Sequence, residues 1–100
     1  MSQYYFNKLI PPRPSFAQDM SDDERRAMGE HVRYWTNLAE KGIAVVFGPV
    51  ADPKGVYGIC VTQAESAEEI AEFTANDPAI LAGLGLRYET YPMLNAIRGK

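Results

Sequence analysis

The spacing of apolar residues changes several times along the chain, and each change predicts the boundary of an element. Residues 3–10 form an aromatic and aliphatic run that ends at two prolines, which predicts a first strand. Residues 43–50 and 55–61 are apolar on both alternating faces, as expected of buried strands. The sequence DPKG between them is typical of a type I turn, so these strands are expected to form an antiparallel hairpin. A last strand is expected from residue 84 or 85 to about residue 91.

Apolar residues recur at helical spacing between the first two predicted strands and predict a long helix. Ser21 and Glu24 form an S-x-x-E capping box at its start, and Gly42 is a typical left-handed stop at its end. The only histidine of the sequence, His31, lies on the apolar side of this helix. We expect the buried stripe to contain Met28, Val32, Trp35, Leu38 and Ala39. We expect the solvent-exposed face to contain Glu24, Arg25, Arg33, Glu40 and Lys41.

A second helix is predicted to follow the hairpin. Ser66 and Glu69 form another capping box, and Ile70 and Phe73 begin its apolar stripe. Because a proline disfavours helical geometry in the residue before it, Pro78 places the end of this helix at residue 76 or 77. A short turn is then expected to lead into the last strand.

The order strand, helix, strand, strand, helix, strand predicts an α+β fold of the ferredoxin-like βαββαβ type. Right-handed crossovers place both helices on one face of a four-stranded antiparallel sheet. At 100 residues, the chain is expected to form a single domain, residues 1–100. Strands that are apolar on both faces need a cover on each, and no further segment can cover the second face. We therefore expect a homodimer formed sheet to sheet, or a higher homo-oligomer.

Composition and charge exclude several classes of function. The net charge of −3, with one basic pair among acidic residues, argues against nucleic acid as a partner. Apolar runs stay well short of the roughly 20 residues of a membrane span, and residues 1–10 lack the pattern of a signal peptide. We therefore expect no membrane association and a cytoplasmic location. Cys60 is the only cysteine, so no intramolecular disulfide is possible, and a buried, inert thiol is expected.

Candidate chemistry centres on His31 and Asp77. The two helices of such a fold run antiparallel on one face, which brings the end of the second near the middle of the first. A carboxylate bonded to one imidazole nitrogen makes the other nitrogen a better base, so the pair could transfer protons. Two other interpretations stay open: His31 as a satisfied core residue, and Asp77 as the N-cap of a short helix that begins at Pro78. One carboxylate can serve both roles of Asp77, because it accepts several hydrogen bonds.

Other candidates depend on weaker signals. Tyr5 and Tyr34 are candidates for lining a pocket, although aromatic residues of this kind mostly form cores and interfaces. Gly48 and Pro49 end the second strand, where a small residue either admits a ligand or only terminates the strand. The connection of residues 11–20 is longer than a strand-to-helix link requires, so it is a candidate pocket wall. One histidine and one cysteine give no metal-ligand spacing, and no flavin, haem or dinucleotide motif is found, so no metal and no cofactor are expected.

The segments EHVRYWTNLAEKGIAVVFGPVADPKGVYGICV and EEIAEFTANDPAILAGLGLRYETYPM resemble the YCII-related (YciI-like) family. The shared pattern falls on His31, Gly48-Pro49, Asp77-Pro78 and Ala82-Gly83. The resemblance implies a ferredoxin-like dimeric α/β barrel with His31 and Asp77 as the active-site pair. The best-understood activity of the family is that of a dehydrochlorinase acting on a chlorinated hydroxyhydroquinone, and related barrels include muconolactone isomerase and cofactor-free monooxygenases. The proline-rich residues 11–15 depart from the family and could reshape the pocket rim.

Two functions from different classes follow. In the leading hypothesis the protein is a small cofactor-independent lyase or isomerase that acts on a small cyclic or aromatic metabolite. His31 moves a proton and Asp77 orients it. The candidate substrate-binding residues are Tyr5, Tyr34, Gly48, Pro49 and Pro78. In the alternative the chain is a non-catalytic small-molecule-binding or accessory dimeric module, or a purely structural subunit without a pocket.

Overall fold

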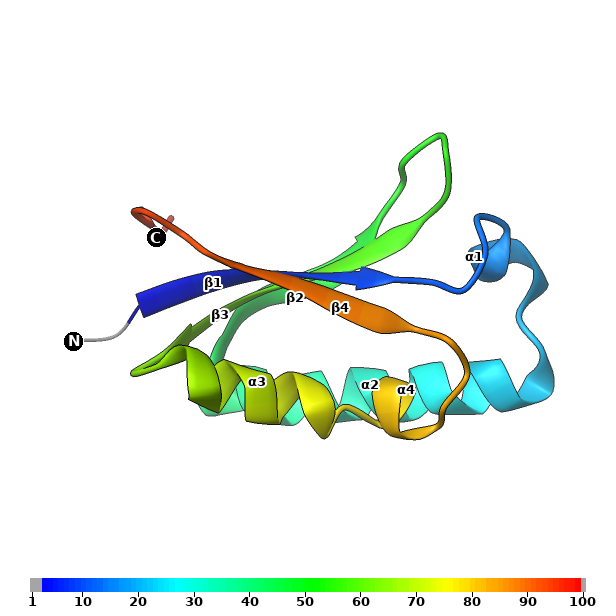
Figure 1. Cartoon of the computed structure of the whole chain (residues 1–100), viewed down its shortest axis with the longest axis horizontal. Coiled ribbons are helices and arrows are strands. Elements are labelled where there is room, and N and C mark those ends of the chain that lie inside the picture. The colour runs from blue at the N-terminus through cyan, green and yellow to red at the C-terminus, as the bar shows by residue number, and fades with distance from the viewer. Residues whose placement is uncertain (1–2, 100) are drawn as a thin grey trace.

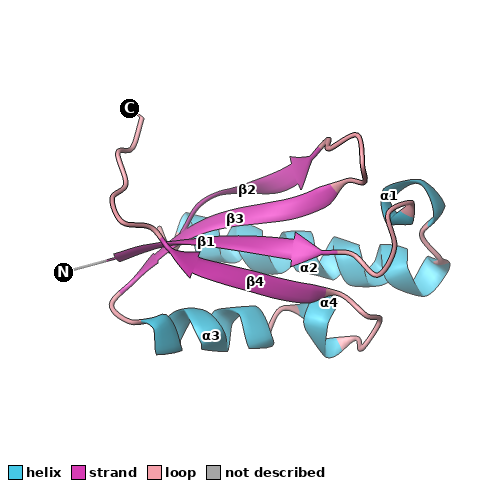
Figure 2. Ribbon diagram, turned by 45° about the horizontal axis from the view of Figure 1, so that its top comes forward, coloured by secondary structure: helices cyan, strands magenta, loops and turns pink. Residues whose placement is uncertain are grey.

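The computed structural model describes residues 3–99 as one antiparallel sheet with helices on one of its faces (Figures 1 and 2). The sheet has four strands in the order β2-β3-β1-β4. The ferredoxin-like α+β fold predicted from the sequence is therefore confirmed. Among residues 3–99, no helix is long and apolar enough to cross a membrane. In chain order the elements are β1 (Gln3–Ile10), α1 (Phe16–Asp19), α2 (Asp22–Glu40), β2 (Ala44–Val50), β3 (Tyr57–Ala64), α3 (Ala67–Ala75), α4 (Pro78–Leu81) and β4 (Arg87–Pro92).

Both predicted ends of the long helix α2 are confirmed. The Glu24 amide donates to Ser21 Oγ at 3.1 Å, and the Ser21 amide donates to Glu24 Oε1 at 2.8 Å, which completes the capping box. Gly42 has a φ of +79°, and the amides of residues 42 and 43 donate back to Ala39 and Leu38 in a Schellman motif. The helix is thus bounded by local side-chain and backbone chemistry.

The second helical region differs from the prediction in detail. Ser66 caps α3, accepting from the Glu69 amide at 3.3 Å, but the Glu69 carboxylate accepts from the Glu65 amide at 3.2 Å. The reciprocal half of the expected capping box is therefore replaced by a bond one residue earlier. The residues expected to form a turn begin with the short helix α4, which has Asp77 as N-cap and Pro78 in its first turn.

The hairpin of β2 and β3 is confirmed, although its strands are shifted. The Gly55 amide donates to the Asp52 carbonyl at 2.9 Å, and the Lys54 amide donates to the Asp52 side chain at 2.9 Å. The connection extends beyond this turn, so β3 begins at Tyr57 and not at residue 55. β4 begins at Arg87 and ends at Pro92, which an edge strand tolerates because one side of it makes no ladder bonds.

The core lies between the sheet and the helices. Trp35 from α2 and Ile70 from α3 are fully buried there. Two expectations for α2 are wrong. Val32 is 50% exposed because it lies at the rim of the covered face, and Glu24 is only 8% exposed because its carboxylate is covered by hydrogen-bond partners. The opposite face of the sheet carries no helix among the described residues (Figure 1).

Candidate functional site

His31 and Asp77, which are 46 positions apart in the sequence, meet where α4 packs against α2. His31 Nδ1 lies 2.7 Å from Asp77 Oδ2. The other carboxylate oxygen of Asp77 accepts from the Ala79 amide at 2.9 Å and caps α4. The helix-capping role and the contact with His31 therefore use different oxygens of one carboxylate.

Asp77 is a buried carboxylate held by several donors. Its side chain is 0% exposed, and Oδ2 also accepts from Trp35 Nε1 at 2.9 Å and from the Tyr88 hydroxyl. Burial alone raises the pKa of Asp77, but the hydrogen bond and charge of His31, with the bonds from Tyr88 and Trp35, hold this pKa below its ordinary value. Asp77 is therefore ionised at neutral pH.

The hydrogen bonds assign the tautomer of His31. An ionised carboxylate only accepts hydrogen bonds, so the ring nitrogen facing Asp77 must carry a proton. The described residues place no hydrogen-bond partner on the second ring nitrogen, Nε2. Nε2 is consequently the atom of His31 available to a ligand, and the carboxylate behind the ring increases its basicity.

Tyr88 belongs to this cluster, although no pattern in the sequence marks it as a site residue. Burial, together with the negative charge of Asp77, raises the pKa of Tyr88, so its hydroxyl stays protonated and donates to the carboxylate. The same hydroxyl lies 3.1 Å from Trp35 Nε1. Tyr88 pairs with Leu9 across the sheet and so shares its helix-facing side. The alternation of side chains along β4 indicates that Tyr88 faces the helices, but it does not indicate that Tyr88 bonds to Asp77.

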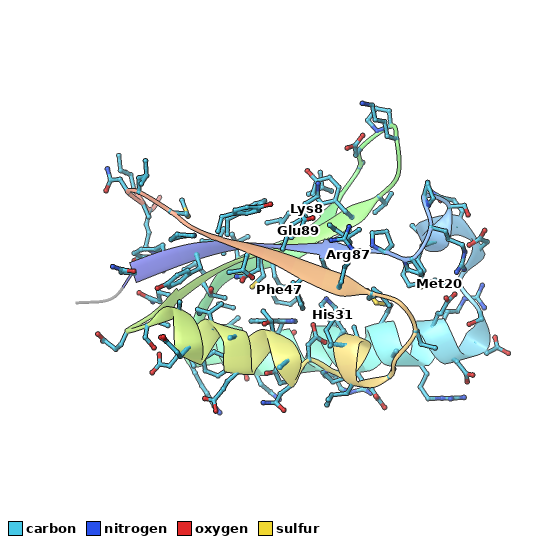
Figure 3. The ribbon with its side chains drawn as sticks, in the orientation of Figure 1. Lys8, Met20, His31, Phe47, Arg87 and Glu89 are labelled. Atoms are coloured by element: carbon cyan, nitrogen blue, oxygen red, sulfur yellow. The ribbon has the colours of Figure 1, made fainter. Side chains whose placement is uncertain are left out.

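A cavity of about 320 Å³ opens beside the pair, between the sheet and α2. This volume lies in the range of small-molecule sites, roughly 300–1,000 Å³. His31, Trp35 and Tyr88 form one wall, while Met28 and Phe47 are among the apolar side chains that line the rest. In Figure 3, His31 and Phe47 lie between the sheet and α2. The arrangement is a hydrophobic chamber with a polar cluster at one side.

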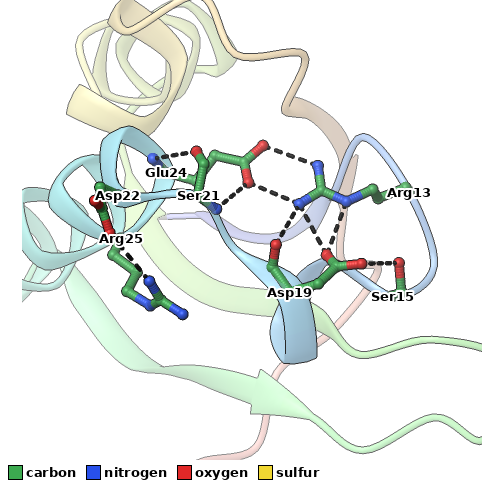
Figure 4. A network of polar contacts seen from close by, with 7 residues as sticks. All are labelled: Arg13, Ser15, Asp19, Ser21, Asp22, Glu24 and Arg25. Carbon is green, nitrogen blue, oxygen red and sulfur yellow. Dashed lines mark hydrogen bonds and ion pairs between the residues drawn. The ribbon is translucent and has the colours of Figure 1, made fainter.

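Residues 11–20, here called the cap, close one end of the cavity through Phe16, Ala17 and Met20. They contain the short helix α1, although the sequence predicts only a connection here. Arg13 joins the cap to α2: its Nη1 and Nη2 donate to the two Glu24 oxygens at 2.9 and 2.7 Å (Figure 4). Its Nε also donates to Asp19 Oδ1 at 2.8 Å within the cap. The candidate pocket wall is thus a structured, tethered segment.

Two glycines let the cap approach the loops beside it. Gly55 has a φ of +146°, and a Cβ there would lie 3.0 Å from the Pro14 carbonyl oxygen. Gly85 has a φ of +91°, and a Cβ there would lie 3.2 Å from the Pro12 side chain. A side chain at either position would be strained and would push the prolines away.

The structure separates the predicted ligand-binding residues into two groups. Gly48 and Pro49 line the cavity along β2. Tyr5 packs against Ile70 in the core under α3, and the Tyr34 hydroxyl donates to the Phe73 carbonyl at 2.6 Å. Pro78 lies in the first turn of α4. Tyr5 and Tyr34 contact residues of α3 and Pro78 is part of α4, and none of the three lines the cavity.

Cys60 is buried, as the sequence analysis predicts, and it forms part of the cavity wall. Burial, with a smaller effect from the charge of Asp77, raises the pKa of its thiol to about 12. Because the thiolate is the reactive form, Cys60 serves as a small apolar side chain in this wall.

Comparison with known sequences supplies the family. The sequence profile of the YCII-related domain matches residues 6–94. The chain belongs to the YCII-related domain family. No protein of curated function matches its sequence.

This YCII-related chain is similar in fold to two solved structures. The first is the 5-chloro-2-hydroxyhydroquinone dehydrochlorinase TftG from Burkholderia phenoliruptrix AC1100, in complex with 2,5-dihydroxybenzoquinone. It has a TM-score of 0.65 and 24% identity, over 92% of this chain and 95% of that one. The second is the uncharacterized protein TM1266 from Thermotoga maritima, with a TM-score of 0.53 and 11% identity, over 93% and 99% of the two chains. At these identities the likeness establishes the fold.

Proposed function

We propose that this protein is a small cofactor-independent enzyme of the lyase or isomerase type. In this proposal His31 and Asp77 transfer a proton on a small cyclic or aromatic metabolite. The observation that carries the proposal is the contact between His31 Nδ1 and Asp77 Oδ2 beside an apolar cavity. The similarity to a dehydrochlorinase solved with 2,5-dihydroxybenzoquinone supports a ring-shaped substrate.

The proposed chemistry needs only these two side chains. His31 Nε2 takes a proton from a C–H or O–H bond of the substrate, and the negative charge of Asp77 stabilises the imidazolium that forms. In an elimination, the leaving group departs with the electron pair of the bond that breaks. In an isomerisation, His31 returns the proton to another carbon. Neither route requires an external oxidant or reductant.

The surroundings favour this division of roles. Asp77 is fully buried and held by Trp35 and Tyr88, so it does not need to reorganise when His31 becomes charged. A ligand bound between the apolar walls displaces water from the pair, which strengthens the interaction between the imidazolium and the carboxylate. His31 is 12% exposed and lies on the cavity wall, so it is accessible to a ligand there.

We also propose that the active form is a homodimer, joined through the sheet face opposite the helices. On this side Val46 is 54% exposed, and Ile97, from the C-terminal segment beside it, is 92% exposed. Pairing this face with a second copy would remove apolar surface from water and complete an α/β barrel.

The test of catalysis uses 2-tetralone, a neutral bicyclic ketone with weakly acidic C–H bonds. The protein is expected to accelerate exchange of the protons beside the carbonyl in D₂O, followed by ¹H NMR. The H31Q variant should exchange these protons about 100-fold more slowly than the wild type, since general base catalysis contributes roughly 10²–10⁴-fold. D77N should also lose most of the rate, because the amide no longer fixes the tautomer. Far-UV circular dichroism checks the fold of both variants.

The matched control is R33Q, on the exposed part of the same helix, which should retain the full rate. If H31Q and wild type exchange 2-tetralone equally fast, the proton-transfer role of His31 is wrong. If 2-tetralone raises the melting temperature of the wild type without faster exchange than buffer, the protein is a small-molecule-binding module instead.

A further inference from the structure

We infer that the cavity selects uncharged ligands of one or two rings that carry a single hydroxyl or carbonyl group for His31. The inference rests on the proposed function in one respect, that the ligand occupies the cavity beside His31.

The cavity walls offer no cationic partner to an anion. None of the described residues that line the cavity is a lysine or an arginine. Arg13, in the cap, is already engaged by the carboxylates of Glu24 and Asp19. Lys8 lies on the sheet face away from the helices (Figure 3), with its ammonium 4.5 Å from the centre of the Tyr57 ring. A ligand carboxylate or phosphate would therefore be buried without a counter-charge.

Asp77 makes an anionic ligand still less favourable. While His31 is neutral, the pair beside the cavity carries one negative charge, and when His31 is protonated the pair carries none. In both states an anion leaves water for apolar walls that have no net positive charge. Burial of an unpaired charge is strongly unfavourable, so the walls discriminate against anions.

The walls also limit how many polar groups a ligand can carry. The Trp35 indole N–H and the Tyr88 hydroxyl both donate to Asp77, and Cys60 is a neutral thiol. His31 Nε2 is the polar side-chain atom of the helix-side wall that stays available. A second or third ligand hydroxyl would exchange its bonds to water for contact with largely apolar walls, which opposes binding.

The volume sets the size of the ligand. An apolar cavity of about 150 Å³ holds one benzene molecule. The cavity here, of about 320 Å³, is about twice as large, and so fits two fused rings or one substituted ring. The expected ligand is thus more apolar than the dihydroxybenzoquinone held by the dehydrochlorinase neighbour.

The test is a titration of the wild-type protein at neutral pH with three probes of nearly equal size. They are 2-naphthol, 2-naphthoate and 2,7-dihydroxynaphthalene. Because the chain has a single histidine, its imidazole NMR signals report binding at the cavity directly. We expect 2-naphthol to shift these signals and to bind at least about tenfold more tightly than either other probe. Equal or tighter binding of 2-naphthoate or of 2,7-dihydroxynaphthalene, or no shift of His31 by 2-naphthol, would overturn the inference.

A second arm tests the electrostatic cause. Val32 is half exposed and lines the cavity, so it can be replaced by a longer side chain without emptying the core. V32R adds a cation at the mouth, and V32Q is the uncharged control. V32R should gain at least about tenfold in affinity for 2-naphthoate relative to V32Q. Equal affinity of the two variants would show that charge is not the cause of the selectivity.

These results stay separate from the test of catalysis. The order of the three dissociation constants can fail while 2-tetralone still exchanges through His31, and this would reject only the ligand class. If the three dissociation constants keep the expected order but the protein does not accelerate exchange of 2-tetralone, only the proposed function is rejected.

Discussion

At the scale of single residues, Asp77 makes the hydrogen bonds that connect the residues of the candidate site. It caps α4 with one oxygen and accepts from His31, Trp35 and Tyr88 with the other. A buried carboxylate would ordinarily be protonated, and the pKa of Asp77 is lowered only because these donors outweigh burial. The charge that orients His31 is therefore maintained by residues on two separate elements, α2 and β4.

Replacing Tyr88 by phenylalanine tests this view. Y88F removes one donor but leaves Asp77 Oδ2 two others, so the variant should fold with a loss of about 2 kcal/mol in the free energy of unfolding. Urea unfolding measures the loss. Y91F on the same strand is the control, since its side chain is 53% exposed, and it should change the stability by less than about 0.5 kcal/mol.

The same variant predicts a pH dependence with a definite sign. The pKa of Asp77 is lower in the folded state, so its stabilisation is complete above the unfolded value, about 3.9, and is lost as the pH falls through the folded value. Y88F raises the folded pKa toward the unfolded one. The difference in stability between wild type and Y88F should therefore shrink as the pH falls below the pKa of an ordinary carboxyl group. A difference that stays constant with pH would contradict this assignment of the hydrogen bond.

Local signals in the sequence predict much of this structure. The capping box of Ser21 and the left-handed Gly42 need only their neighbours, and both are found as predicted. The burial of Glu24 was not predictable, because its partner Arg13 belongs to a loop whose path no local pattern sets. Val32 follows the apolar stripe of α2 but is half exposed, since the covering of a helix depends on where the sheet ends. Tyr88 can be identified as a site residue only from its bond to Asp77, which forms through the tertiary structure.

At the scale of elements, Arg13 connects the cap to the start of α2. The bidentate bond from Arg13, followed by the Ser21 amide, holds the pKa of Glu24 at about 2. The stabilisation from Glu24 is thus present above the ordinary pKa of 4.5 and is lost as the pH falls toward 2. The cap should therefore stay attached at pH values where ordinary glutamates are already protonated.

The R13M variant tests the function of this connection. It should increase hydrogen exchange of the α1 amides and weaken 2-naphthol binding, because Phe16 and Met20 would no longer be held against the cavity. Amides of β1 and β3 should keep their protection. R25M is the control, since Arg25 is an exposed arginine that among residues 3–99 forms an ion pair with Asp22. Equal exchange of α1 in R13M and R25M would show that the ion pairs of Arg13 do not hold the cap.

At the scale of the whole molecule, the two faces of the sheet differ in their cover. Helices α2, α3 and α4 lie on one face, while the described residues leave the other without a helix (Figure 1). Val46 and Ile97 are exposed on that side, near the C-terminal segment. The cavity lies on the opposite, helix-covered side, so a partner subunit is not needed to form its walls.

The V46E variant tests the proposed dimer. Val46 is 54% exposed, so a glutamate is tolerated in the isolated chain, but in a dimer it would bury an unpaired charge. Sedimentation equilibrium should show a dimer for the wild type and a monomer for V46E, with unchanged far-UV circular dichroism. V32E is a matched control, because Val32 is 50% exposed on the helix side, and it should stay dimeric. A monomeric wild type, or equal association of V46E and V32E, would rule out this face as the dimer interface.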